Sequence, residues 1–208
     1  TCIGTVPCRE TKGMKRRYEV LIILFIIVLT IPLARGRGLT ETNFSVLGNR
    51  GSRRICFLLW GALVGSYLYL YIEETAELAK CADRTQEWLT GLALAVFLCG
   101  IGLPYRTRLV PLMARIHVYL SVGGTILYLF CIRRLLILLE RQYGTGFRIE
   151  KWIAVSMTAV GVFLYIYAGI ISSLLEIYVT LGSCIYLYRL RRKIEKWVCK
   201  SKTSMLYY

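Results

Sequence analysis

Residues 152–188, WIAVSMTAVGVFLYIYAGIISSLLEIYVTLGSCIYLY, form one nearly continuous apolar run whose single charged residue is Glu176. A membrane crossing needs about 20 residues of α-helix, so this run is too long for one crossing. The stretch AGIISS, residues 168–173, can hold a short turn. The run therefore predicts two spanning helices joined at that turn.

Four further apolar segments precede this run, and polar connections separate them. They cover residues 18–34, 55–72, 88–103 and 112–132. With 56% hydrophobic residues, whole segments are apolar rather than single faces, which is typical of helices surrounded by lipid. We predict an all-α fold, a polytopic membrane helical bundle of about six transmembrane helices in residues 18–188.

The distribution of Lys and Arg predicts the orientation of this bundle. If the N-terminus lies inside, 19 of the 27 basic residues fall on the inner side, which favours N- and C-termini in the cytoplasm. The first loop, with five arginines on the outer side, runs against this trend. We expect an integral, multi-pass protein of the plasma (cytoplasmic) membrane, with a basic N-terminal tail at 1–17 and a basic cytoplasmic tail at 189–208.

The beginning of the chain allows more than one interpretation. Residues 1–13 differ in character from the basic and apolar stretch after them, so they could be an extension upstream of a start at Met14. A basic stretch before an apolar run is typical of a signal peptide and equally of a retained first helix. We favour a retained helix over residues 18–34.

Composition argues against several classes of site. The net charge is +15, and the basic residues flank apolar segments. We therefore expect them to orient the protein in a membrane rather than to bind nucleic acid. The eight cysteines form no CxxC pair and there is one histidine, so we expect no metal, no cofactor and no disulfide framework. The 15 tyrosines, for example in SYLYLYIEE, are interpreted as belts at the membrane interface.

Strongly polar residues within the apolar segments are the candidate binding residues, because each is costly in lipid. In the predicted topology the outer half of the membrane would hold a ligand-binding cluster of His117, Glu176, Arg115, Ser45 and Asn49. A Glu–His pair would have complementary charges, and an arginine could hold a lipid phosphate. The alternative is that His117 and Glu176 satisfy each other structurally while Arg115 reaches the surface.

Small residues mark a helix-packing face in the second segment. GALVG places Gly61 and Gly65 on one side of a helix, where they allow a close helix contact or leave a face for a partner or a second copy. The chain lacks HExxH, GxSxG and P-loop motifs, so we find no catalytic residues by motif.

The order of four residues resembles that of the Frag/DRAM/Sfk-like six-helix membrane proteins. Ser45 and Gly48 lie in a loop after the first helix, Pro104 lies in a later loop, and His117 lies near the start of the fourth helix. The resemblance covers about residues 18–188 and implies lipid handling or membrane organisation.

These observations predict a non-enzymatic integral membrane protein that binds lipid or a partner protein through an outer-leaflet polar pocket. The expected partners are membrane lipids, with a partner protein or homo-oligomer possible through helix faces. One alternative is a small-solute transport component, which would need interrupted helices near the midplane; Gly123–Gly124 is one hint of this. Another is an intramembrane lipid-modifying enzyme using His117 and Glu176.

Overall fold

The fold is known from a computed structural model, which describes residues 10–35, 38–49, 51 and 53–205. Within these residues it contains helices and no strand, so the all-α prediction is confirmed. The helices are α1 (Glu10–Ala34), α2 (Phe44–Gly48), α3 (Arg53–Leu78), α4 (Arg84–Gly102), α5 (Pro111–Tyr143), α6 (Arg148–Ala168) and α7 (Ser173–Met205), with a 3-10 turn at Gly144–Phe147 between α5 and α6.

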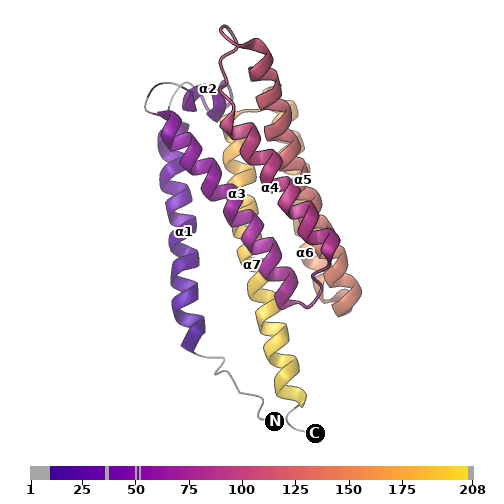
Figure 1. The fold of residues 1–208 in the computed structure, drawn as a ribbon. Coiled ribbons are helices and arrows are strands. Elements are labelled where there is room, and N and C mark those ends of the chain that lie inside the picture. The colour runs from indigo at the N-terminus through magenta and orange to yellow at the C-terminus, as the bar shows by residue number, and fades with distance from the viewer. Residues whose placement is uncertain (1–9, 36–37, 50, 52, 206–208) are drawn as a thin grey trace.

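The six long helices run side by side and alternate in direction (Figure 1). The short helix α2 and the α4–α5 connection lie at one end, which we call the α2 end. The start of α1 and the end of α7 lie at the other, which we call the termini end. The segment expected as a basic tail at 189–208 continues α7 as far as Met205.

Three helical stretches are long and apolar enough to cross a membrane. They are Arg53–Leu78, Arg84–Gly102 and Pro111–Ala168, the last of which contains α5, the 3-10 turn and α6. The apolar part of α1, Tyr18–Ala34, is shorter. The predicted division of residues 152–188 is found, because α6 ends at Ala168, the next residue is a left-handed Gly169 with φ of 66°, and α7 begins at Ser173.

Helices α4 and α5 pack closely, and glycines allow this contact. A Cβ on Gly124 would lie 2.7 Å from the backbone N and Cα of Phe97. A Cβ on Gly100 would lie 2.6 Å from the backbone N of Ser121. Backbone atoms cannot move aside as a flexible side chain can, so both positions require glycine for this crossing.

Neighbouring glycines in α5 give a matched test of this contact. Replacing Gly124 with alanine should destabilise the protein by about 1–3 kcal/mol, because the helices must separate. A Cβ on Gly123 would have no heavy atom within 4 Å, so Gly123→Ala should be neutral or stabilise by up to about 1 kcal/mol. Thermal unfolding in detergent measures both, and equal midpoints for the two variants would refute the close contact.

Gly61 and Gly65 pack inside the chain. A Cβ on Gly61 would lie 2.4 Å from Ile101, and one on Gly65 would lie 3.1 Å from Phe97, both in α4. The hydroxyl of Tyr128 also donates to the Gly65 carbonyl at 2.8 Å. Gly61 and Gly65 therefore face α4, which covers this side of α3, so this face is not open to a partner or a second copy.

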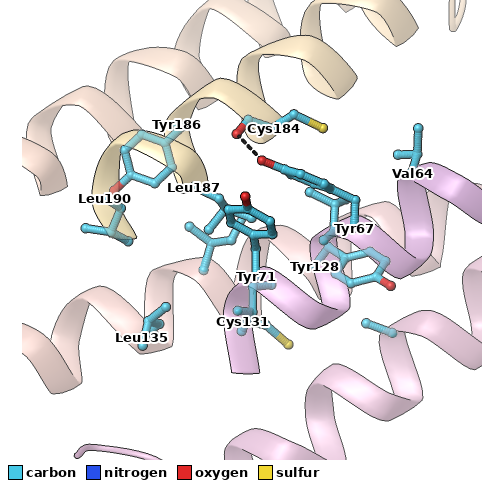
Figure 2. Packing of buried hydrophobic residues seen from close by; sticks show 14 of the residues in the cluster. Val64, Tyr67, Tyr71, Tyr128, Cys131, Leu135, Cys184, Tyr186, Leu187 and Leu190 are labelled. Atoms are coloured by element: carbon cyan, nitrogen blue, oxygen red, sulfur yellow. Dashed lines mark hydrogen bonds between the residues drawn. The ribbon is translucent and has the colours of Figure 1, made fainter. Parts of the chain in front are cut away.

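The tyrosines of α3 correct the interpretation as interface belts. Tyr67 and Tyr71 lie four residues apart, share one buried face and stack with ring centroids 4.2 Å apart. Figure 2 shows both rings between α3 and α7, with the Tyr67 hydroxyl donating to the Cys184 carbonyl at 3.2 Å. Residues four apart lie on the same face of a helix, so Tyr67 and Tyr71 could have been recognised as a shared face. The spacing of two between successive tyrosines of this segment hid that pattern.

At the termini end, Asp83 joins the start of α4 to α5. Its carboxylate accepts from the Gln86 N–H at 2.7 Å, which caps α4, and from both terminal nitrogens of Arg134 at 2.9 and 2.7 Å. The hydrogen bond from Arg134 is the main reason why the pKa of Asp83 lies below its usual value.

The Asp83–Arg134 pair predicts a pH dependence of stability. Because the folded state lowers the pKa of Asp83, wild type should be more stable than Asp83→Asn above the unfolded pKa of about 3.9. That advantage should disappear as the pH falls through the lowered pKa. Asparagine keeps the helix cap, so unfolding midpoints of the two proteins across pH isolate the charge. Parallel curves would contradict the prediction.

Candidate functional site

The candidate site begins with the segment between α1 and α3, which is held against the start of α7. The N–H and hydroxyl of Ser173 both donate to the Thr42 carbonyl, at 2.7 and 3.0 Å. The Leu174 N–H donates to the Leu39 carbonyl at 3.0 Å. The first N–H groups of a helix have no partners within it. These bonds therefore supply acceptors for the first N–H groups of α7 and also fix the segment between α1 and α3.

Glu176 adds a further tie, which joins α7 to α2 itself. Its Oε2 accepts a hydrogen bond of 2.6 Å from the Phe44 N–H, the first N–H of α2. Asn43 caps the same helix by accepting from the Val46 N–H at 2.8 Å. The position of α2, and with it the position of Ser45, therefore depends on α7.

His117 lies buried in α5, and both ring nitrogens are within hydrogen-bond distance of a partner. Nε2 lies 2.7 Å from Ser45 Oγ, and Nδ1 lies 3.2 Å from the Leu103 carbonyl oxygen. His117 is 1% exposed and Ser45 is 8% exposed. The Tyr105 ring packs on the imidazole with a centroid distance of 5.4 Å.

These partners determine which nitrogen of His117 carries the proton. A carbonyl oxygen only accepts, so Nδ1 donates to Leu103. In the neutral imidazole the lone pair then lies on Nε2, and the Ser45 hydroxyl donates to it.

His117 and Glu176 have different partners. His117 and Glu176 both lie at the α2 end of the bundle. His117 bonds Ser45 and Leu103, whereas Glu176 bonds the backbone of Phe44. Their link is indirect, because Phe44 and Ser45 are consecutive residues of α2.

Asn49 joins the cluster through a neighbour that the sequence did not single out. Its side-chain amide donates to the Ser45 carbonyl at 2.8 Å and its oxygen accepts from Arg54 at 3.1 Å. Arg54 also donates to the Gly102 carbonyl at 2.6 Å at the end of α4. Arg54 therefore links α2, α3 and α4, and the arginine-rich first loop was the available signal for it.

Arg115 lies apart from this cluster. It is exposed on α5 and lines an open depression of about 390 Å³. The other lining residues are Tyr105, Thr107, Pro111, Ala114, Val118 and Tyr119. Because Tyr105 also packs on His117, this one ring contacts both the depression and the buried histidine.

The residues that carried the family resemblance lie near one another. Gly48 packs so closely on α3 that a Cβ would lie 2.6 Å from the Phe57 side chain. Phe57 in turn lies 6.3 Å from His117, ring to ring. Pro104 follows Leu103, whose carbonyl His117 contacts. No family model, curated protein or solved structure matches this chain.

A second polar cluster lies at the termini end and was missed from the sequence. Arg191 of α7 is buried, and its Nη1 lies 2.8 Å from Glu19 of α1 and 2.7 Å from Glu74 of α3. Its guanidinium also lies over the Tyr71 ring, 5.2 Å from the centroid. An acidic residue at the start of an apolar segment, Glu19, was the available signal.

Among the described residues no group of His, Cys, Asp or Glu could hold a metal ion.

Two replacements of Glu176 test how α2 is held. Glu176→Gln keeps an oxygen acceptor for the Phe44 N–H and should leave stability nearly unchanged. Glu176→Leu leaves that buried donor without a partner and should cost about 1–3 kcal/mol. Hydrogen exchange at the Phe44 amide, followed with the thermal midpoint, should accelerate only in the leucine variant. Equal exchange in both variants would show that Glu176 does not hold α2.

Proposed function

We propose that this protein is a lipid-binding integral membrane protein with six spanning helices and both termini in the cytoplasm. In this topology the α2 end faces outward from the plasma membrane. Large apolar side chains exposed on α1 and α6, such as Phe25 at 53% and Phe163 at 63%, support a lipid environment for these helices. The proposal keeps the resemblance to Frag/DRAM/Sfk-like proteins as a hypothesis about lipid handling.

The depression beside Arg115 is the observation that carries the binding proposal. Arg115 supplies a cation and Thr107 a hydroxyl, while Ala114 and Val118 supply apolar surface. An anionic phospholipid presents the matching chemistry, a phosphate joined to acyl chains. The depression and the arginine are therefore suited to a headgroup, with the chains lying along α5.

The surroundings of the depression fit the headgroup layer. Arg106 and Arg108 are exposed on the α4–α5 connection, which contains no acidic residue. Leu109 and Leu112 beside them are 73% and 66% exposed. Basic and apolar side chains that are exposed together favour an interface of anionic headgroups and acyl chains.

Native mass spectrometry of the full chain tests this proposal. Protein reconstituted with equal phosphatidylglycerol and phosphatidylcholine should retain phosphatidylglycerol, and Arg115→Gln should reduce retention roughly threefold to tenfold by loss of a charge-assisted bond. Arg133→Gln is the matched control, because Arg133 is an exposed arginine of the same helix at the other end. Equal retention by wild type and Arg115→Gln would refute binding at this depression.

A further inference from the structure

The Ser45–His117 hydrogen bond is the arrangement that activates a serine for nucleophilic attack. The hydroxyl lies 2.7 Å from Nε2, within the distance over which a base removes a proton. In the assigned tautomer Nε2 carries the lone pair and faces the hydroxyl. We propose that Ser45 is the nucleophile and His117 the general base of a centre that hydrolyses the carboxylic ester of a lipid. This inference rests on the proposed function, since the lipid is the one held beside Arg115.

A third group orients the base. The Leu103 carbonyl accepts from Nδ1 at 3.2 Å, so the imidazole is held in one orientation with the correct nitrogen toward Ser45. Serine hydrolases use a carboxylate in this position. A neutral carbonyl holds the tautomer equally well but stabilises the positive imidazolium less, so turnover is expected to be slow.

Substrate access is the next requirement, and Tyr105 is the residue that would have to move. The Tyr105 ring lines the depression on one side and packs on the His117 ring on the other. Ala114, which also lines the depression, lies three residues before His117 on the same face of α5. A shift of Tyr105, which lies on the α4–α5 connection, would therefore bring an ester in the depression next to the buried pair.

The chemistry needs only water as a second reactant. Ser45 Oγ forms a bond to the ester carbonyl carbon while its proton passes to Nε2 of His117. The bond from that carbon to the alcohol oxygen breaks, and the alcohol leaves with the proton from His117. Water then attacks the acyl group on Ser45, gives its proton to His117, and releases the fatty acid as Ser45 recovers its proton.

A fluorophosphonate probe on the full chain in nanodiscs tests the nucleophile. We expect a phosphonyl adduct that peptide mapping places on Ser45, formed at the same rate in wild type and in the control Arg133→Gln. Ser45→Ala should give no adduct there, and His117→Gln should slow its formation about a hundredfold, as expected for loss of a general base. Circular dichroism checks that each variant is folded.

Tyr105→Ala separates a reactive serine from a structural hydrogen bond. If Tyr105 screens the pair, removing its ring should speed labelling of Ser45, whereas a bond that only ties α2 to α5 gains no reactivity. No adduct on Ser45 in folded wild type or in folded Tyr105→Ala would overturn the proposal, and so would an adduct confined to other residues. Because this result needs no Ser45 or His117 variant, it stands even if those variants fail to fold.

Fatty acid release from phosphatidylglycerol vesicles tests the substrate class. Wild type should release fatty acid, and Ser45→Ala should not. A labelled Ser45 without release would overturn the lipid ester as substrate. Lipid retention that depends on Arg115, with Ser45 unreactive, would overturn the catalytic centre and leave the proposed function intact. Reactive Ser45 without that retention would instead contradict the proposed function.

Discussion

The close backbone contact between α4 and α5 is the constraint on which the α2 end depends. Gly124 lets α5 approach the backbone of Phe97, and Gly100 lets α4 approach Ser121. This crossing places the last turn of α4 beside the first turns of α5, so the Leu103 carbonyl reaches His117. A larger residue at either glycine would move the carbonyl that selects the histidine tautomer. The packing of two apolar helices thus selects the tautomer of His117.

The second half of the pair is positioned from the other side of the bundle. Ser45 belongs to a helix of five residues, too short to be stable alone, so its place comes from its contacts. Glu176 of α7 holds the first residue of α2, Ser173 of α7 holds Thr42 just before it, and Gly48 of α2 packs on Phe57 of α3. Ser45 and His117 are separated by 72 positions in sequence and meet because α3 and α7 hold α2 against α5.

The sequence predicted the long helices well because their signal is local. The break after Ala168 and the packing of Gly61 and Gly65 follow from short stretches of residues. The partners of the polar residues could not be predicted, because they depend on distances between helices. From the sequence, either Ser45 or Glu176 could be the hydrogen-bond partner of His117. Only the position of α2 in the fold decides between these two residues. The burial of Arg191 against Glu19 was missed for the same reason, since these residues are 172 positions apart.

The two polar clusters differ in a way that bears on function. At the termini end, Arg191 is balanced by Glu19 and Glu74, so its charge is already stabilised by neighbours of the same chain. Such a cluster joins helices and leaves little for a ligand to satisfy. At the α2 end, Ser45 and His117 form a pair in which the serine hydroxyl donates a hydrogen bond to the lone pair of a neutral imidazole. A neutral pair can transfer its proton in a reaction without breaking an ion pair that holds the fold. For this reason we place the chemistry at the α2 end rather than at the more highly charged termini end.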